Sequence, residues 1–547
     1  MSKAEAARRA AILEALGRKR REVEETPLPA NLGALLDRAV ERYRDRVCWL
    51  SIEDGESLTF GAFGEQVARC AAALRRLGVA RGTQVGVMLP SVPAVAITWM
   101  ALARLGAVMI PINTRYTQRE LDHVLTGGRA ELLVIDAAHR DLLEREGEAF
   151  PLPLGRVVVH GAAVSGTAGE WHQLVSASEP LAENPQVDLD EVMTLQFTSG
   201  STGAPKACVL PHRYWLVLAL TRLHQGPPIG RLLHDMPFHY MGGQWRFLMA
   251  LWGGITACVA PRPSLTRMLD RLLAHRIEFC SVTPALAKQP LAPRRGDLSL
   301  AWAGTMAMPK HLCADVEERL GGAPVREMYG TTETGAAVAM PYEVDWMEGS
   351  CGLAVPFRDL KLVDAEGNEV RDGTPGELWI AGPGVMQGYF ANEEATRAAF
   401  CGAWFRSGDL FVRDRDGFMT MLGRIKDVIR RSGENISASE VESVLMSLPQ
   451  VEEAAAVGVP DDLRGEEVMA CLKLAPGVAP ADLPAETVVD WCRKQLAPFK
   501  VPRYVAYLPE LPKTPSGKIA KKAVLPALAA NGIETWDAAA PSLSALT

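Results

Sequence analysis

The sequence predicts an α/β fold with parallel sheets, because segments with helical periodicity alternate with short apolar segments that suit buried strands. The first alternation runs through a helical segment (57–79), a strand (83–90), a helix (91–108) and a strand (109–112). It returns as a strand (231–238), a helix from Trp245 to Gly253, a strand (255–260), a helix with a following strand (265–284) and a strand (324–330). Two such stretches predict two α/β subdomains.

A different pattern starts at about Cys351, where short apolar segments are separated by turns rich in Asp, Gly and Asn. Turns about every ten residues favour a small β barrel or sandwich. After Gly423 the pattern is mixed, with a helix opened by a Ser cap (437–450), a strand (451–460) and a helix (486–496). We therefore expect a large N-terminal region of two α/β subdomains plus a small β barrel, followed by a small α+β region. Few structural signals follow Gly532.

Length and composition exclude several classes of protein. The 547 residues suffice for two to four domains, and 48% hydrophobic with 22% charged residues is typical of a soluble globular protein. A formal charge of −7 and a pI near 5.9 argue against a nucleic-acid binder, which needs a positive surface. A site for an anion would therefore be confined to a small part of the surface.

Targeting and membrane signals are weak. The N-terminal 25 residues mix five Glu with seven Lys or Arg and predict an amphipathic surface helix, not a signal or transit peptide. The longest apolar run (247–260) has fourteen residues, short of the roughly 20 that cross a bilayer. The ten cysteines form no CxxC pair, which favours reduced thiols and a cytoplasmic location.

The stretch TSGSTGAPK, from Thr198 to Lys206, is suited to holding phosphate. Its glycines and proline exclude a regular element, so backbone NH groups and hydroxyls can converge on an anion. Apolar segments on both sides predict a hairpin-like turn at the end of a sheet. It is not a Walker A loop, because no Ser or Thr follows the lysine.

Four more stretches complete a pattern: DMPFHYMGG (235–243), MYGTTETG (328–335), WFRSGDL (404–410) with GRIKDVIRRSGENIS (423–437), and TPSGKI (514–519). In this order and at these separations the five closely resemble the adenylate-forming superfamily of acyl-CoA synthetases, peptide-synthetase adenylation domains and luciferases. The resemblance covers nearly the whole chain. It implies a nucleotide-binding domain (1–423), a hinge (424–427), a mobile C-terminal domain (428–535) and a tail (536–547).

The resemblance also assigns the nucleotide site. The loop around the β- and γ-phosphates of ATP would comprise Thr198, Ser199, Gly200, Ser201, Thr202, Gly203 and Lys206. Ala207 and Cys208 follow where the family usually has Gly-Val. The segment Glu327, Met328, Tyr329, Gly330, Thr331 would line the nucleotide, with Tyr329 against the adenine. Thr332 would contact the α-phosphate and Glu333 would hold Mg²⁺, which prefers oxygen ligands.

The later motifs match residues with other roles. Asp409 would receive the ribose hydroxyls, with Arg424 as a second ribose or phosphate contact. Lys518 matches the catalytic lysine that bridges the carboxylate and the α-phosphate, which suits a compact cation on a flexible stem. Lys426 aligns with the hinge and Gly433 with the path of the thiol. Arg430, Arg431, Lys500 and Arg503 are candidates for the phosphates of CoA, with ordinary solvated charge as the alternative reading.

The acyl pocket is less well defined. His239 matches an aromatic gate between the acyl pocket and the thiol path. The pocket positions would be Tyr240, Met241, Gly242, Trp245, Ala303, Gly304, Thr305, Gly330 and Met340. Trp245 could close a short pocket or receive a quaternary ammonium, and Arg246 could pair with a second carboxylate. The spacing of His212, His234 and His239 fits no compact zinc site, and Cys208 with His212 has no third partner for nucleophilic catalysis.

Together the motifs predict an AMP-forming acyl-CoA ligase for a small-to-medium carboxylic acid, with ATP, Mg²⁺ and CoA and with some likeness to the crotonobetaine/carnitine group. The leading alternative is a stand-alone adenylation enzyme that loads a carrier-protein thiol. A nucleotide-binding regulatory protein would not need Lys518, and nothing signals the oxygen chemistry of a luciferase. A homodimer is expected only by analogy.

Overall fold

The computed structural model describes residues 3–144, 149–181, 186–198, 205–289, 298–306, 308, 312–344, 349–431, 434–461, 464–496, 498–514 and 517–538. The chain divides into two compact units. The first comprises Met1–Leu360 and Ile380–Phe405, and the second comprises Lys361–Trp379 and Arg406–Thr547. The α/β class predicted from the sequence is confirmed.

The first unit contains a seven-stranded sheet in the order β7-β6-β5-β3-β4-β8-β9. Its neighbours are parallel except for the antiparallel pair β8 and β9. The strands are β3 (Gln84–Met88), β4 (Val108–Pro111), β5 (Leu132–Asp136), β6 (Val157–His160), β7 (Gly169–Glu170), β8 (Val192–Thr198) and β9 (Lys206–Pro211).

A nine-stranded sheet in the same unit has the order β16-β15-β14-β13-β12-β10-β11-β1-β2. The central strands from β1 to β14 are parallel, and the flanking pairs are antiparallel. The strands are β1 (Val47–Ser51), β2 (Ser57–Thr59), β10 (Arg231–His234), β11 (Thr256–Val259), β12 (Phe279–Ser281), β13 (Trp302–Thr305), β14 (Val325–Thr331), β15 (Gly335–Ala339) and β16 (Leu353–Ala354).

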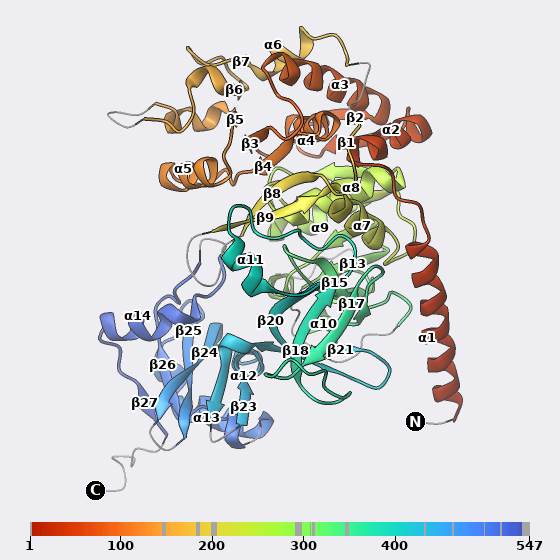
Figure 1. The fold of residues 1–547 in the computed structure, drawn as a ribbon. Coiled ribbons are helices and arrows are strands. Elements are labelled where there is room, and N and C mark those ends of the chain that lie inside the picture. The colour runs from red at the N-terminus through yellow and green to blue at the C-terminus, as the bar shows by residue number, and fades with distance from the viewer. Residues whose placement is uncertain are drawn as a thin grey trace, which may run out of the picture. The chain divides into compact units, whose positions relative to one another are not determined.

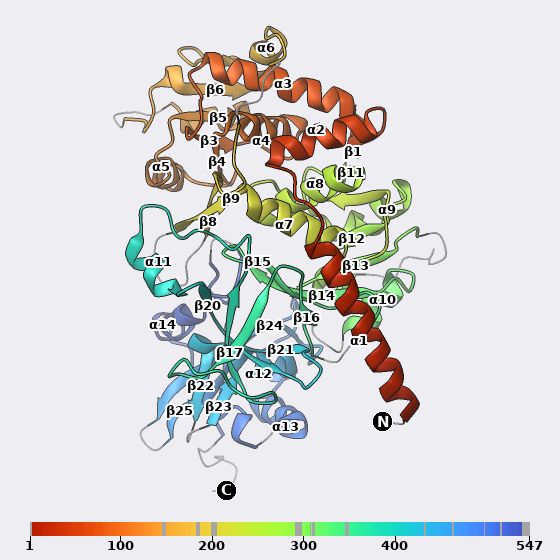
Figure 2. The same cartoon turned by 45° about the vertical axis from the view of Figure 1, so that its right-hand side comes forward.

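The helices of the first unit follow in chain order, and most of them pack against these two sheets. They are α1 (Lys3–Glu24), α2 (Leu32–Tyr43), α3 (Phe60–Arg76), α4 (Pro93–Leu105), α5 (Gln118–Gly127), α6 (Trp171–Ser176), α7 (His212–Leu223), α8 (Met241–Gly253), α9 (Leu265–Ala274), α10 (Cys313–Arg319) and α11 (Glu393–Ala399). Both ribbon views show α2, α3 and α4 side by side (Figures 1 and 2). Of residues 5–24 in the predicted N-terminal helix, Val23 alone is buried.

The alternation of side chains along the strands explains this layering. In β5, Leu132 and Val134 face the core that α2, α3, α4, α7 and α8 form between the two sheets. Leu133 and Ile135 face the opposite side, which α5 covers. The far side of the nine-stranded sheet packs against α9 and α10. Parallel strands buried on both faces are apolar throughout, which is why the sequence predicts them readily.

A five-stranded sheet has the order β17-β18-β20-β19, with β21 paired to β20. It forms where the turn-rich pattern predicts a small β barrel or sandwich. The strands are β17 (Asp359–Val363), β18 (Gly376–Ala381), β19 (Phe400–Cys401), β20 (Trp404–Arg413) and β21 (Met419–Arg424).

The second unit contains a six-stranded sheet in the order β23-β22-β25-β26-β27, with β24 paired to β25. Its elements are β22 (Val428–Arg431), β23 (Glu434–Ser437), α12 (Ala438–Met446), β24 (Val451–Asp461), β25 (Gly465–Leu474), α13 (Ala485–Gln495), β26 (Tyr504–Tyr507), α14 (Val524–Ala530) and β27 (Trp536–Asp537). Helices α12 and α13 pack on one face and α14 on the other. The predicted Ser cap is present, since the Ser437 hydroxyl accepts a hydrogen bond from the Glu440 amide at 3.2 Å.

Strand β27 differs from the sequence prediction, which places residues 536–547 in a tail. Trp536 and Asp537 instead pair with β26. Their side chains are held as well, because the Trp536 indole donates to Glu486 at 3.1 Å and Asp537 binds Arg503. Tertiary contacts of this kind leave no local signal in so short a strand.

Candidate active site

The predicted phosphate loop lies at the tip of the β8–β9 hairpin. Thr198 is the partner of Lys206 in the register, and its hydroxyl donates to the Lys206 carbonyl at 3.4 Å. Because β8 runs parallel to β4, this tip lies at the carboxyl edge of the seven-stranded sheet, where open α/β sheets bind ligands. The predicted residues Ser199, Gly200, Ser201, Thr202 and Gly203 lie outside the described residues.

The MYGTTETG motif forms a second tight hairpin, at the carboxyl end of β14. Thr331 pairs with Gly335, so Thr332 and Glu333 lie in the turn. A Cβ on Gly330 would come within 2.2 Å of the Gly335 carbonyl oxygen, which explains why glycine is required there. Tyr329 is buried just before the turn, and the Glu327 carboxylate accepts a hydrogen bond from the Met308 amide at 3.1 Å.

A segment that the sequence did not single out connects these two hairpins. Residues 387–390 run along β9, with the Val209 amide bonded to the Gly388 carbonyl at 2.9 Å and the Phe390 amide to the Ala207 carbonyl at 2.8 Å. At the start of the segment the Met386 amide donates to the Glu333 carbonyl at 2.8 Å. The segment therefore fixes the second hairpin relative to the first.

Tyr389 of this segment contacts charged residues from both hairpins. Its hydroxyl donates to Oε1 of Glu333 at 2.9 Å, and the ammonium of Lys206 lies 5.2 Å from its ring centroid. Burial, and secondly the charge of Glu333, raise the pKa of Tyr389. Tyr389 therefore stays protonated and acts as a donor. Tyr389 thus brings together Glu333 and Lys206, although the three residues are far apart in the sequence.

Cys208 and His212 do not form a nucleophilic pair. Burial raises the pKa of the Cys208 thiol well above its usual value, and the charge of Glu333 raises it further. Burial lowers the pKa of His212 to about 4, and its Nδ1 accepts a hydrogen bond from the Leu32 amide at 3.2 Å. A buried neutral thiol is a poor nucleophile.

The predicted gate residue His239 lies at the start of a buried amide chain. Its carbonyl accepts a hydrogen bond from Gln196 at 2.9 Å, and Gln196 in turn accepts one from Gln244 at 3.3 Å. Its ring lies 4.4 Å from that of Tyr240, which is 38% exposed. Burial, followed by the charge of Arg115, lowers the pKa of His239 to about 4. His239 is therefore neutral at physiological pH.

The predicted acyl-pocket positions come from α8 and the ends of β13 and β15. Met241 receives a hydrogen bond from the buried Tyr214 hydroxyl at 2.7 Å. The Thr305 hydroxyl donates to the Val282 carbonyl at 3.0 Å, so it already has an acceptor. Trp245 lies against two arginine side chains, Arg222 and Arg246. Arg222 was not identified from the sequence. The remaining positions are the buried Ala303 and Met340, with Gly242 and Gly304.

In the second unit, Asp409 and Arg424 face each other across β20 and β21. They are register partners, and Nε of Arg424 lies 3.2 Å from Oδ1 of Asp409. Asp409 is 1% exposed, whereas the Arg424 side chain is 49% exposed. A buried carboxylate next to an accessible guanidinium suits a role in holding hydroxyl groups.

Lys518 lies on an exposed turn that backbone hydrogen bonds define. The Thr514 amide donates to the Lys518 carbonyl at 2.7 Å, and the Thr514 hydroxyl accepts from the Lys518 amide at 3.2 Å. The ammonium therefore takes no part in holding the turn. Lys426 lies in a short 3-10 helix, Ile425–Asp427, and Gly433 lies outside the described residues.

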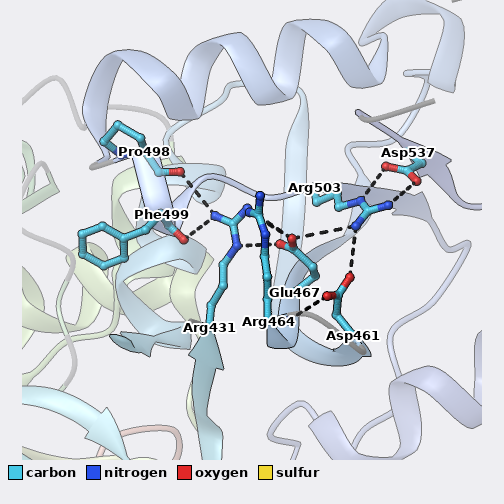
Figure 3. A network of polar contacts seen from close by, with 8 residues as sticks. All are labelled: Arg431, Asp461, Arg464, Glu467, Pro498, Phe499, Arg503 and Asp537. Carbon is cyan, nitrogen blue, oxygen red and sulfur yellow. Dashed lines mark hydrogen bonds and ion pairs between the residues drawn. The ribbon is translucent and has the colours of Figure 1, made fainter. Parts of the chain in front are cut away.

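Three candidates for the phosphates of CoA are instead engaged by carboxylates of the second unit. Lys500 binds Glu440 at 2.7 Å. Arg431 donates to the Phe499 carbonyl at 2.7 Å, and its Nε lies 2.6 Å from Glu467 (Figure 3). Arg503 forms a two-pronged pair with Asp537 at 2.9 and 3.1 Å. The polar network in Figure 3 therefore stabilises the fold of this unit. The side chain of the fourth candidate, Arg430, is outside the described set.

Two kinds of feature are absent from the described residues. No helix in that part of the chain is both long enough and apolar enough to span a bilayer. Nor do three or more His, Cys, Asp or Glu side chains come together there in a group that could hold a metal ion.

Comparison with known proteins identifies the family. Residues 36–390 match the family described as AMP-binding enzyme, and residues 440–518 match the AMP-binding enzyme C-terminal domain. The chain belongs to the AMP-binding enzyme family, which confirms the relationship predicted from the five motifs.

Its relatives include CoA ligases. The chain is 30% identical to a long-chain-fatty-acid–CoA ligase of Escherichia coli, over 89% of this chain and 93% of that one. It is 32% identical to a feruloyl-CoA synthase of Amycolatopsis sp., over 85% and 93%. The crystal structure of a benzoate CoA ligase from Burkholderia xenovorans LB400 superposes with a TM-score of 0.79 at 26% identity, covering 89% of this chain and 98% of that one.

Proposed function

We propose that the protein is an AMP-forming ligase that adenylates a carboxylic acid and then transfers the acyl group to CoA. The observation that carries this proposal is the contact of Tyr389 with both Glu333 and Lys206. It brings a carboxylate and a lysine of the phosphate loop to one place at the carboxyl edges of two sheets. Adenylation requires both kinds of group, because a metal-bound polyphosphate must be held and its charge offset.

In the first step an oxygen of the substrate carboxylate attacks the α-phosphorus of ATP, and the bond to the bridging oxygen of pyrophosphate breaks. Lys206 and the loop that begins at Thr198 hold the leaving phosphates. Thr332 and Lys518 contact the α-phosphate. Lys518 offsets the repulsion between the two anions, and its exposed turn leaves the ammonium available.

Other residues bind the ribose and the adenine of ATP. Asp409 accepts hydrogen bonds from the ribose hydroxyls, with Arg424 beside it. Tyr329 lies against the adenine, while Glu327, Met328, Gly330 and Thr331 line the nucleotide.

Glu333 fits a role in holding Mg²⁺. Its carboxylate is an oxygen ligand of the kind that Mg²⁺ takes, and the hydrogen bond from Tyr389 fixes one oxygen so that the other can face the ion. When bound, the ion neutralises charge on the phosphates. A single carboxylate suffices, because Mg²⁺ commonly keeps waters and phosphate oxygens as its other ligands.

In the second step the CoA thiolate attacks the acyl carbon, the thioester bond forms, and AMP leaves. A rotation of the second domain (428–535) about the hinge (424–427) would withdraw Lys518 from the active site. The same rotation would bring in the segment near Gly433, which would line the path of the thiol, with His239 as the gate. The nucleotide-binding domain of this proposal is residues 1–423. The reaction uses cytoplasmic ATP and CoA, which fits a cytoplasmic location, and a homodimer remains an expectation by analogy.

The test is pyrophosphate release from ATP and Mg²⁺ across a panel of carboxylic acids, with and without CoA, for the wild type and the Lys518→Ala variant. Turnover that depends on both the acid and CoA, and that is lost in the variant, supports the ligase. Adenylate formation that does not respond to CoA would identify a carrier-loading enzyme instead.

A further inference from the structure

Arg222 is a buried arginine of α7 whose charge has no acidic partner in the described part of the chain. Its side chain is 1% exposed, and Nε, Nη1 and Nη2 are all buried without a hydrogen-bond acceptor among the described residues. The guanidinium instead lies against two indole rings, 4.7 Å from the centroid of Trp245 and 5.7 Å from that of Trp302. Burial, followed by the charge of Arg246, lowers the pKa of Arg222 to about 9. Arg222 is therefore still a cation at neutral pH.

Arg246 places a second cation against the same ring of Trp245. It is 4% exposed, and its guanidinium carbon lies 4.9 Å from the Trp245 centroid. Its Nη1 donates to the Gly242 carbonyl at 2.9 Å, while Nε has no acceptor within the described ranges. Asp235 is the buried acid whose charge acts on Arg246, whereas no acid acts on Arg222. Of the two buried cations, Arg246 therefore has a nearby carboxylate and Arg222 has none in the described residues.

More unpaired polar atoms lie in the sequence around Arg222. Oγ1 of Thr221 and both amide atoms of Gln225 are buried without hydrogen-bond partners in the described residues, and so is Nε1 of Trp302. Burying an uncompensated charge costs several kcal/mol, and buried polar groups in native proteins are nearly always satisfied. A group of buried polar atoms left without partners indicates a binding function.

The two guanidinium groups reach the positions that match the acyl pocket. A Cβ on Gly304 would lie 3.3 Å from Nη2 of Arg222, and one on Gly242 would lie 3.4 Å from Nη1 of Arg246. Glycine at both positions leaves the cations next to bare backbone. Trp245, whose ring contacts both guanidinium groups, belongs to the same set of positions.

We infer that the acid activated by this protein is a dicarboxylic acid, whose second carboxylate pairs with Arg222 and Arg246 while the first is adenylated. This inference rests on the proposed function, whose substrate class it names. A carboxylate supplies the missing negative charge and can accept two parallel hydrogen bonds from a guanidinium. A hydroxyl or a carbonyl would satisfy hydrogen bonds but leave the charge uncompensated. A monocarboxylic acid would leave the arginine unpaired, and sites built this way reject such analogues strongly.

The experiment compares acids matched in length: succinate with butyrate, glutarate with pentanoate, adipate with hexanoate, and terephthalate with 4-methylbenzoate. Two quantities are measured on the full-length protein. One is kcat/KM for ATP–pyrophosphate exchange, and the other is the shift in melting temperature that each acid causes. At least one diacid should exceed its matched monoacid by about 10- to 100-fold in kcat/KM, the worth of a hydrogen bond to a charged group. The same diacid should raise the melting temperature more than its partner does.

Arg222→Met tests the assignment to this side chain, with Arg267→Met on the exposed end of α9 as the matched control. The Arg222 variant should lose the preference for the diacid and gain activity with the monoacid, while the control keeps the wild-type preference. Removal of an uncompensated buried cation should also leave the ligand-free melting temperature unchanged or higher.

The wild-type comparison decides the matter without any variant. Monoacids used as well as their matched diacids, and converted to CoA esters, would overturn this inference and leave the proposed ligase standing. Diacids that raise the melting temperature without supporting exchange would show that a diacid binds but is not activated, which would contradict both the ligase and the assignment of its substrate. If no diacid stabilises the protein or supports exchange better than its monoacid, the inference is wrong.

Discussion

The hydroxyl of Tyr389 lies 2.9 Å from Oε1 of Glu333, and the ring of the same tyrosine lies beneath the ammonium of Lys206. One side chain therefore positions the proposed metal ligand and the lysine of the phosphate loop. Tyr389 is a positioning residue in this arrangement, because it acts on the phosphates only through its two neighbours.

Tyr389→Phe should weaken the binding of Mg²⁺ without disrupting the fold. The ring stays beneath Lys206, and the hydrogen bond to Glu333 is lost, so we expect kcat/KM for adenylation to fall by about 10- to 100-fold. The Mg²⁺ concentration needed for half-maximal activity should rise as well. A purely structural role would lower the melting temperature and leave the magnesium dependence where it is. Glu333→Gln should produce the larger loss.

The sequence predicts the central elements of the fold correctly because these elements carry their own periodicity. Apart from Gln84 at its start, strand β3 is apolar, and β4 is apolar throughout, since both faces of each strand are buried. Helix α4 begins at Pro93 and is capped at its carboxyl end by Gly106, which has a φ of 68°. These signals are local and visible without the structure.

Contacts between distant segments carry no such signal. Tyr389 lies 56 residues from Glu333, and nothing near it distinguishes it from a tyrosine of the core. Arg222 resembles any helical arginine until its burial is known. Spacing alone leaves Arg431 and Arg503 available for phosphate, but the structure gives both of them carboxylate partners. Pairing of this kind depends on the tertiary fold.

Asp409→Asn should raise the KM for ATP. The amide is nearly isosteric but carries no charge and accepts hydrogen bonds at one atom only, so we expect an increase of about 10-fold or more. Arg424→Gln should have a smaller effect, because the Arg424 side chain is 49% exposed and solvent screens its charge. ATP titration in the exchange assay measures both. An unchanged KM for ATP in the Asp409 variant would show that Asp409 does not bind the ribose.

His212 and His234 should make stability depend on pH. Burial lowers the pKa of each to about 4, and the charge of Arg246 also lowers that of His234. In the unfolded chain the value is about 6.5. The stabilising contribution is therefore complete above pH 6.5 and is lost as the pH falls towards 4, by about 1.4 kcal/mol per pH unit for each histidine. Thermal unfolding at a series of pH values measures how steeply the free energy of unfolding falls as the pH is lowered. This dependence should be weaker in His234→Gln, whereas His172→Gln, at an exposed position, should keep the wild-type dependence.

Glu467→Gln should destabilise the second unit. Glu467 is 1% exposed and lies 2.6 Å from Arg431 and 3.2 Å from Arg464, with Arg503 at 3.8 Å. Removing the buried negative charge leaves the arginines uncompensated, at a cost of about 3–5 kcal/mol. Urea denaturation measures the change. Asp490→Asn removes an exposed partner of Arg493 and should cost less than about 1 kcal/mol. Equal losses in the two variants would contradict the central role of Glu467.

Lys518→Ala should separate the two half-reactions. Backbone and Thr514 hydrogen bonds hold its turn, so the variant should fold with an unchanged melting temperature. Adenylation should fall by about 100-fold or more, because the variant lacks the charge that offsets the repulsion between carboxylate and α-phosphate. Thioester formation from a supplied acyl-adenylate and CoA should stay within a few-fold of the wild type, since that step does not bring a free carboxylate against the α-phosphate. Lys522→Ala is the matched control, an exposed lysine four residues further on that should leave both steps unchanged. Equal loss of both half-reactions in the Lys518 variant would mean that this lysine acts on the thiol step as well, and an unaffected adenylation step would remove it from the active site.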